Sequence, residues 1–435
     1  MKGRSMLKGT LAGVLALAFL WGIVGSGTVP TSTAGDQGLY KNLKTFNEIL
    51  DIIENNYVEE IEPEKVMEGA IQGMIRSLDP HSIYLSPEMY RELQVDTKGV
   101  FGGLGIEITV KDDVLTVVSP IEDTPAFIAG IKADDRIVAI EGTSTQGMNI
   151  MEAVRKLRGP KGSQVTISIL REGLTKPRDY TITRDIIKVH SVKNERMEGD
   201  IGYLRIAAFN ENTLEEVTGA LKAMTGKKDP LKGLVIDMRN NPGGLLDQAV
   251  FVSDVFLKKG LIVSTKGRIP SADKTYEARD DGDELSCPMV VLINRGSASA
   301  SEIVAGALRD NGRALLVGTQ TFGKGSVQAV IPLNDGSALK LTTAKYYTPD
   351  GTSIQAKGIT PDILVELDRS QRNGSAEEES GAILREKDLE GHLPGESREA
   401  EGLSGENTKK RPDNQLKYAV DLLKSWNVFE GLKGR

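Results

Sequence analysis

The spacing of hydrophobic residues divides the chain into regions with different predicted structures. From residue 36 to 96, apolar residues recur at the three- and four-residue spacing of helices. From 97 to 187, short segments with alternating apolar residues predict strands, with one amphipathic helix from Asn149 to Leu157. From 188 to 366, strand and helix patterns alternate. The pattern therefore predicts a helical N-terminal segment, a small β-rich domain with helices, and an α/β core.

Two segments of the third region are almost continuously apolar. They run from Leu231 to Asp237 and from Pro288 to Asn294. A strand that is buried on both faces does not need polar residues at alternate positions. We therefore expect both segments to be buried strands of the core sheet.

The N-terminus has the pattern of an export signal, which we assign to residues 1–34. Three basic residues come first: Lys2, Arg4 and Lys8. Leu11 to Val24 is uncharged and mostly apolar, and Ser32-Thr-Ala34 resembles a small-residue cleavage site. The apolar stretch is shorter than the about 20 residues that a spanning helix needs, which favours a cleaved signal peptide. The alternative is an uncleaved signal anchor that would attach an exported, periplasmic protein to the inner membrane.

The C-terminal part falls into two segments. Residues 367–412 contain no Phe, Tyr or Trp and are dominated by Glu, Ser, Gly, Lys and Arg. Such a segment buries too little apolar area to offset its chain entropy, so we predict that it is disordered. Residues 413–435 predict an amphipathic helix, which needs a partner surface on this chain or on another subunit. The terminal helices are therefore candidate contacts of a homo-oligomer.

Composition narrows the classes of protein further. With 435 residues, the chain is expected to form two or three domains. Its net charge of −7 argues against a nucleic-acid binder, which would normally have a basic face. The single cysteine, Cys287, excludes an intramolecular disulfide and a multi-cysteine metal site, and we expect it to be a buried structural thiol. The three histidines lack metal-ligand spacing: His81, His190 and His392.

Ser299 and Lys324 are the residues that best suit a chemical role. Ser299 lies where a strand pattern gives way to a helix pattern, and Lys324 stands between Gly323 and Gly325. Serine is a weak nucleophile that requires a neighbouring base. A lysine acts as that base only where desolvation or a positive field makes its neutral amine accessible near neutral pH. The two glycines let the backbone hold the lysine close to a catalytic turn, so the pair predicts a serine–lysine hydrolase.

Both motifs also have simpler explanations. Ser299-Ala-Ser-Glu302 matches a capping box, in which Ser299 would only start a helix. The residues alone do not choose among Ser297, Ser299 and Ser301 as nucleophile. Gly318-x4-Gly323-Lys324-Gly325 nearly matches a phosphate-binding P-loop, but residue 325 is glycine where Ser or Thr should bind Mg²⁺. Capping and catalysis therefore compete for Ser299, whereas the P-loop is disfavoured.

Residues 101–106, Phe-Gly-Gly-Leu-Gly-Ile, resemble the carboxylate-binding loop of PDZ domains. Phe127 to Glu141 resembles a further PDZ signature, and the helix at 149–157 would form the other wall of the groove. In PDZ domains, backbone N–H groups of the loop hold a C-terminal carboxylate while the peptide adds as a strand. The resemblance implies a PDZ domain at 97–187. Its peptide site would be formed by Leu104, Gly105 and Ile106. The alternative is a glycine-rich turn in an unrelated small barrel.

Several motifs occur in the order of a known family. They are Leu78-Asp-Pro-His-Ser82, the PDZ loop, Asp237-Met-Arg-Asn-Asn-Pro-Gly-Gly244, Gly296-Ser-Ala-Ser-Ala-Ser-Glu302, Gly323-Lys-Gly-Ser-Val-Gln328 and Tyr346-Tyr-Thr-Pro349. With them, residues 40–366 resemble the carboxy-terminal processing proteases, or tail-specific proteases, which are serine–lysine endopeptidases. The resemblance implies an α/β catalytic core of the Clp-protease and crotonase type at 188–366, preceded by an inserted PDZ domain. It also implies protein or peptide substrates with free C-termini, and no metal or organic cofactor.

The resemblance gives each residue of the site a role. By position, the resemblance implies that Ser299 is the nucleophile, Lys324 is its base and Gln328 orients the lysine. It also implies that the oxyanion hole is formed by the N–H groups of Ala300 and of Gly243, or of the adjacent Gly244. In a straight strand, residues four apart lie about 13 Å from each other. Gln328 therefore reaches Lys324 only if the chain bends around Gly325 and Ser326.

Two other classes of protein share parts of this pattern. A catalytically inactive PDZ adaptor would not need intact Ser299, Lys324 and Gln328. A crotonase-like acyl-CoA enzyme would share the fold but would need neither an export signal nor a PDZ domain. We therefore predict an exported serine endopeptidase that recognises C-terminal tails through its PDZ domain.

Overall fold

The structure is a computed structural model that describes residues 35–111, 114–171, 173, 175–225, 230–282, 285–368, 385–395 and 413–433. The predicted export signal at residues 1–34 lies outside the described residues. The chain divides into two compact units, Met1–Ala70 and Ile71–Arg435. No helix among the described residues is long and apolar enough to span a membrane.

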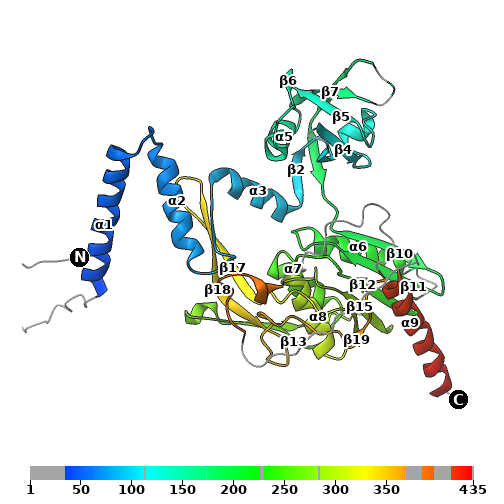
Figure 1. Ribbon diagram of the computed structural model, residues 1–435. Helices are drawn as coiled ribbons and strands as arrows, with labels where there is room; N and C mark the ends of the chain where they lie inside the picture. Colours follow the sequence, from blue (N-terminus) through cyan, green and yellow to red (C-terminus); the bar gives the residue numbers. More distant parts are fainter. Residues whose placement is uncertain are drawn as a thin grey trace, which may run out of the picture. The chain divides into compact units, whose positions relative to one another are not determined.

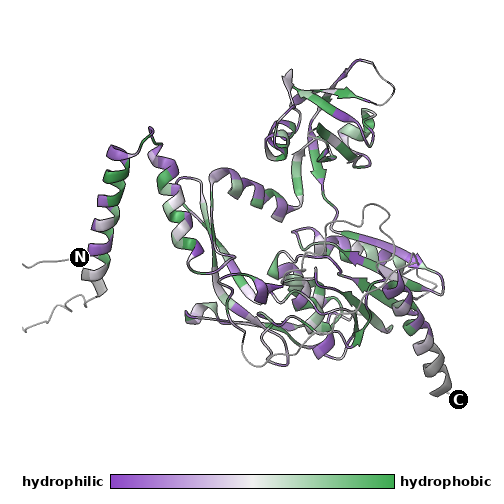
Figure 2. Ribbon diagram, viewed as in Figure 1, coloured by the Kyte–Doolittle hydropathy of each residue, from purple (hydrophilic) through white to green (hydrophobic). Residues whose placement is uncertain are grey.

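The N-terminal segment is helical, as predicted. It contains α1 (Gly35–Asn56) and α2 (Pro63–Arg76). The apolar residues of α1 gather along one side of the helix (Figure 2). Several of them are exposed within the described residues: Leu39, Tyr40, Leu43, Phe46, Ile49 and Ile52. The amphipathic pattern is therefore present in α1, although its apolar side is not packed into a core.

The predicted helical region is interrupted by a short strand, β1 (Ile83–Leu85), before α3 (Pro87–Lys98). The interruption is stabilised by the carboxylate of Asp79, which accepts hydrogen bonds from the following turn, including the N–H and hydroxyl of Ser82. Such a side-chain acceptor gives the backbone an alternative to the helix. The helix α3 then begins where the Ser86 side chain accepts the N–H of Met89.

The region from β2 to β9 forms the β-rich domain. Its main sheet has the order β3-β4-β5-β7-β8, with β6 beside β5, and a separate pair of strands is formed by β2 and β9. The elements are β2 (Val100–Gly103), β3 (Ile106–Lys111), β4 (Val114–Pro120), α4 (Pro125–Ile128), β5 (Arg136–Ile140), β6 (Thr143–Ser144), α5 (Ile150–Leu157), β7 (Gln164–Leu170), β8 (Arg178–Thr183) and β9 (Asp185–Lys188). The alternating residues Val165, Ile167 and Ile169 of β7 are buried in the core of this domain. The strand spacing predicted from the alternating pattern is thus present.

The α/β core is built on a six-stranded sheet of order β10-β11-β12-β15-β16-β19 (Figure 1). Apart from the antiparallel β10, its strands are parallel. They are β10 (Val192–Met197), β11 (Ile201–Ile206), β12 (Gly233–Asp237), β15 (Met289–Ile293), β16 (Leu315–Gly318) and β19 (Ile363–Leu364). Every residue of β12 and β15 is buried, as the two apolar segments predicted.

Helices cover both faces of this sheet. One face packs against α6 (Thr213–Met224), α7 (Leu246–Asp254) and α8 (Ala300–Asp310). The other face packs against the C-terminal helix α9 (Asn414–Lys433). In β12, Leu234 and Ile236 face the first group, whereas Val235 belongs to the buried cluster that contains Ala419 and Leu423 of α9. The predicted C-terminal helix therefore finds a partner surface on its own chain.

A second, antiparallel sheet of the core has the order β1-β18-β13-β14, and β17 also pairs with β18. Its remaining strands are β13 (Gly260–Gly267), β14 (Lys274–Ala278), β17 (Ser326–Pro332) and β18 (Ala338–Tyr347), and the short 3-10 helix η1 (Pro270–Ala272) lies between β13 and β14. The predicted lysine motif leads directly into β17. This sheet thus places the lysine beside the parallel sheet that carries the serine.

The prediction that residues 367–412 are disordered is wrong for residues 385–395. This segment contains a short 3-10 turn, η2 (Glu386–Asp388), in which the Glu386 side chain is completely buried. Composition failed here because the segment is held by polar contacts of a buried carboxylate rather than by apolar burial. The stretches 369–384 and 396–412 lie outside the described residues.

Candidate active site

Ser299 lies between the end of β15 and the start of α8, where the sequence places the nucleophile. Its backbone adopts φ 55° and ψ −114°, a conformation that residues with a Cβ rarely adopt. Such strain is costly and is typical of functional turns. The Glu302 half of the capping box predicted from the sequence is present, because the N–H of Ser299 donates to the Glu302 carboxylate at 2.8 Å. The N–H of Glu302 donates to the backbone carbonyl of Ser299, so the Ser299 hydroxyl is not used as the cap. The contact with Glu302 and the strained backbone therefore coexist at Ser299.

The two neighbouring serines are held in buried hydrogen bonds. The Ser297 hydroxyl donates to the carbonyl of Met238 at 2.8 Å. The Ser301 hydroxyl contacts the carbonyls of Asn241 and Ala298 at 2.9 and 2.7 Å. Both side chains are fully buried, whereas Ser299 is 9% exposed and lines a cavity. The sequence left three serines open, and only Ser299 among them reaches the cavity.

Lys324 lines the same cavity as Ser299. Burial lowers the pKa of Lys324 to about 8, and the positive charge of Lys340 acts in the same direction. Nearby carboxylates oppose this effect: Glu386, Asp79 and Glu302. A lysine with a lowered pKa has an accessible neutral amine near neutral pH, which the predicted role as a base requires.

Gln328 lies within reach of the lysine amine, as its predicted role needs. The Lys324 Nζ atom donates to the Gln328 Oε1 atom at 3.2 Å. The required bend is present, because β17 begins at Ser326 and its register with β18 shifts between Val327 and Gln328. A bulge of this kind re-aims the side chain of a strand. Residues 324 and 328 are therefore not joined by a straight strand.

Glu302 connects the serine turn to the lysine turn. Its completely buried carboxylate accepts the N–H of Ser299, the N–H of Gly323 at 2.8 Å and the N–H of Lys324 at 3.0 Å. The Thr321 hydroxyl is a fourth donor. Burial raises the pKa of Glu302 to about 7, and these donors oppose that effect. From the sequence, Glu302 is predicted only as part of a helix cap, since the capping-box pattern does not reveal its contacts with the lysine turn.

The oxyanion hole stays a prediction, but the hydrogen bonds around it distinguish its candidate donors. The N–H of Gly243 already donates to the Asn241 side chain at 2.8 Å. In contrast, the N–H groups of Gly244 and Ala300 have no acceptor among the described hydrogen bonds. Gly243 nevertheless lies against Ser299, because a Cβ atom on it would lie 2.9 Å from the Cβ atom of Ser299. Gly244, the alternative left open by the sequence, is thus the better-placed donor together with Ala300.

Tyr346 is a further residue of the site that the sequence analysis did not identify. Burial raises the pKa of Tyr346 to about 12, against the opposing effect of a side-chain hydrogen bond with Ser299. Its backbone N–H donates to the carbonyl of Gly325 at 2.7 Å. Tyr346 therefore contacts both the serine and the turn after the lysine. Its sequence signal was the Tyr346-Tyr-Thr-Pro349 motif, to which no role had been given.

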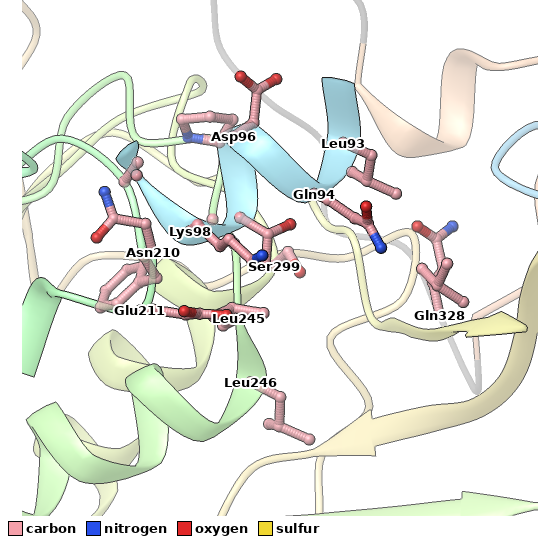
Figure 3. A pocket seen from close by; sticks show the side chains of 18 of the residues that line it. Leu93, Gln94, Asp96, Lys98, Asn210, Glu211, Leu245, Leu246, Ser299 and Gln328 are labelled. Atoms are coloured by element: carbon pink, nitrogen blue, oxygen red, sulfur yellow. The ribbon is translucent and has the colours of Figure 1, made fainter. Parts of the chain in front are cut away.

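The cavity has a volume of about 1000 Å³ and extends from Ser299 to the side chains of α3. Figure 3 shows Ser299 and Gln328 lining it together with Gln94 of α3 and Leu245. The C-terminal end of α3 is fixed to the core, where the carbonyl of Thr97 accepts the N–H of Glu211 at 3.0 Å. A cavity of this size holds several residues of an extended peptide.

The expected carboxylate loop lies at the edge of the β-rich domain. Leu104 is buried in its core, and Gly105 has φ +77°, where a Cβ atom would lie 2.3 Å from the Thr124 side chain. The N–H groups of Leu104 and Gly105 have no acceptor among the described hydrogen bonds. Ile106 begins β3, which pairs only with β4 among the described strands. The N–H groups of Leu104 and Gly105 therefore lie next to an edge of β3 that pairs with no other described strand.

The chain is similar to known peptidases over most of its length. The sequence profile of Peptidase family S41 matches residues 200–365, that of a PDZ domain residues 116–171, and that of the activating protease CtpB N-terminal domain residues 25–89. A carboxy-terminal-processing protease of Bartonella bacilliformis is 48% identical over 400 residues, which cover 90% of this chain and 91% of that protein. The chain belongs to the carboxy-terminal processing proteases of peptidase family S41.

Other members of the family match over most of their length. The carboxy-terminal processing protease CtpA of Bacillus subtilis is 37% identical over 82% of this chain and 76% of that protein. A solved structure of a photosystem II D1 C-terminal processing protease is 31% identical, covers 74% of this chain and 92% of its own, and has a TM-score of 0.44.

As a carboxy-terminal processing protease, this chain is a serine-type peptidase with a PDZ domain. The resemblance recognised from the motifs is confirmed. So is the predicted fold class, an S41 peptidase core with a PDZ domain and N-terminal helices. This membership argues against the alternative of a crotonase-like acyl-CoA enzyme.

Proposed function

We propose that this protein is an exported endopeptidase that binds C-terminal tails of protein substrates and cleaves them with a Ser299–Lys324 dyad. One observation carries the proposal. Ser299, strained at the start of α8, shares a cavity with a lysine whose pKa is lowered to about 8. Serine needs a base close to its hydroxyl, and a desolvated lysine supplies one without a histidine.

The reaction is an acyl transfer. Lys324 takes the proton of the Ser299 hydroxyl, and the Ser299 oxygen attacks the scissile carbonyl. The N–H groups of Gly244 and Ala300 stabilise the tetrahedral anion, each contributing about 3–4 kcal/mol to the transition state. Lys324 then returns the proton to the leaving amine, and water releases the acyl group from Ser299.

Gln328 and Tyr346 position this dyad. The Gln328 Oε1 atom accepts a hydrogen bond from the lysine amine at 3.2 Å, which limits the directions in which the amine points. The Tyr346 side chain lines the same cavity and has a side-chain hydrogen bond with Ser299. Both residues therefore reduce the freedom of the two groups between which the proton moves.

Tail recognition is assigned to the PDZ loop and the adjoining groove. A peptide that adds beside β3 places its terminal carboxylate against the N–H groups of Leu104 and Gly105. Ile150 and Val154 of α5 are only partly buried, unlike Ala153 and Leu157 on its inner side. These exposed apolar side chains suit an apolar last residue of the substrate.

The proposal includes export by the signal at residues 1–34, with the periplasm as the place of action. Attachment to the inner membrane follows if the signal stays uncleaved. The exposed apolar side of α1 suits a homo-oligomer contact, whereas the inner side of α9 is already covered by the sheet.

One experiment separates peptidase from inactive adaptor. The purified chain and its Ser299→Ala variant are incubated with an unstructured protein, and the products are mapped by mass spectrometry. The proposal predicts cleavage by the first and none by the second. Binding of the substrate without cleavage by either would identify an adaptor.

A further inference from the structure

Residues 385–395 lie against the loop that carries Lys324, although they come more than fifty residues after it. The N–H of Glu386 donates to the carbonyl of Phe322 at 3.3 Å. The Arg385 side chain donates to the Gln320 side chain at 3.0 Å, and the Lys345 amine donates to the carbonyl of Pro394 at 3.0 Å. Both ends of the segment are therefore fixed to the lysine side of the site.

The Glu386 carboxylate is the most deeply placed group of this segment. It is completely buried and has two side-chain partners, His81 Nε2 at 2.6 Å and Gln355 Nε2 at 2.7 Å. A buried carboxylate is costly unless such partners satisfy it. His81 comes from the Leu78-Asp-Pro-His-Ser82 motif, so Glu386 joins two segments that lie far apart in the sequence.

Gln355 extends this contact to the catalytic turn. Its Oε1 atom accepts the N–H of Gly325, the residue after Lys324, at 3.0 Å. The Gln355 side chain is completely buried, and a Cβ atom on Gly325 would lie only 2.3 Å from the Gln355 backbone nitrogen. Because Glu386 accepts from the amide nitrogen of Gln355, it directs the amide oxygen toward Gly325. A chain of hydrogen bonds thus runs from His81 to the lysine turn.

We propose that residues 385–395 are a positioning segment for Lys324, which acts through Glu386, Gln355 and the N–H of Gly325. The inference rests on the proposed role of Lys324 as the base. Glu386 does not touch the reacting atoms. It holds the turn on which the base is mounted, and its charge faces Lys324 together with those of Asp79, Glu302 and Lys340.

Two substitutions separate the geometric effect from the charge effect. Glu386→Ala removes both hydrogen bonds, and we expect kcat to fall about tenfold to a hundredfold with little change in KM, because the base is misplaced.

Glu386→Gln keeps a group of the same shape that can bond Gln355 and a neutral His81, so kcat should stay within about threefold of the unsubstituted chain. It removes a negative charge near Lys324, which lowers the pKa of that amine. The acid limb of the pH profile of kcat/KM should therefore move to lower pH.

The matched control is Glu390, which lies in the same segment but is exposed. Glu390→Ala and Glu390→Gln should leave kcat and the pH profile unchanged. Hydrogen exchange supplies a readout that does not depend on activity. Peptides covering residues 320–330 should exchange faster in Glu386→Ala than in Glu390→Ala.

Equal kcat, pH profile and exchange in the Glu386 and Glu390 variants would overturn the positioning role. An increase in exchange spread evenly over the core in Glu386→Ala, together with an unchanged pH profile in Glu386→Gln, would also overturn it, since that result indicates loss of stability only. If the unsubstituted chain does not cleave, or if Lys324→Ala still cleaves, the proposed function fails instead, and the exchange comparison still decides whether the segment holds the turn.

Discussion

The serine turn and the lysine turn meet in one cavity, but the protein supports them differently. Ser299 lies between a fully buried central strand and a buried helix, and its neighbours Ser297 and Ser301 are bonded into the same core. Lys324 precedes β17, which pairs with β18 alone among the described strands. Its turn is held by Glu302 and Gln355, which lie far away in the sequence. The serine turn therefore forms with the core, whereas the lysine turn depends on the docking of distant segments.

The largest expected effect is loss of either member of the dyad. Ser299→Ala and Lys324→Ala should each reduce cleavage about 10⁴-fold or more, because the two groups form one proton-transfer unit. Lys324→Arg should also fail, since a guanidinium group does not deprotonate at working pH. Circular dichroism should show an unchanged fold. Peptide cleavage assays provide the comparison.

Ser301→Ala is the matched control for the serine turn. It removes buried hydrogen bonds, so it should destabilise the fold by about 1–3 kcal/mol while cleavage continues. If Ser301→Ala were inactive and Ser299→Ala active, the nucleophile would have been assigned to the wrong serine.

Glu302→Gln tests the only carboxylate that accepts from both turns among the described residues. An amide nitrogen accepts no hydrogen bond, so at least one N–H donor is left unsatisfied at a cost of about 1–3 kcal/mol. Urea unfolding should show this loss, and cleavage should fall because both turns shift. A variant with full stability and full activity would show that the two turns are held independently.

Tail recognition tests a third region, the PDZ loop. An amidated peptide lacks the charge-assisted part of the carboxylate bonds, worth about 1.5–3 kcal/mol, so it should be cleaved about 10- to 100-fold less efficiently than the free acid. Gly105→Ala, which forces a Cβ atom against Thr124, should remove this preference without changing cleavage of the amide. Equal rates for acid and amide in the unsubstituted chain would exclude recognition by this loop.

Substitution of Gln328 should have a smaller effect on cleavage and tests how the lysine amine is oriented. Gln328→Ala should lower kcat about tenfold at unchanged melting temperature, because the lysine amine loses one orienting acceptor. Gln328→Glu places a negative charge beside the amine and so raises its pKa, which moves the acid limb of kcat/KM to higher pH. An acid limb that moved to lower pH, or not at all, would show that residue 328 does not contact the base.

The central strands and the serine turn are the parts that the sequence predicts best. Continuous apolar runs identified β12 and β15, and the change from strand to helix located Ser299, because these signals are local. The strained backbone conformation of Ser299 could not be predicted from the residue types around it. The proposal of Gly244 rather than Gly243 as an oxyanion donor rests on a single side-chain contact from Asn241, which no motif reveals.

The supports of the lysine turn were hidden for a different reason. Glu386 lies in a segment whose composition is typical of disorder, and its partners His81 and Gln355 are separated from it by long stretches of chain. Composition averages over a window, whereas residues 385–395 are held by a buried carboxylate and a few further polar contacts that composition does not reveal. The role of such a residue becomes visible only when the fold brings its partners together.

The most direct test of the dyad is the labelling of the protein by a serine-reactive fluorophosphonate, followed by mass spectrometry at several pH values. The account predicts that Ser299, and neither Ser297 nor Ser301, is labelled. It also predicts that the rate rises as the pH passes through about 8, where Lys324 loses its proton, and that labelling is lost in Lys324→Ala. Labelling of another serine, or an equal rate in Lys324→Ala, would contradict the account.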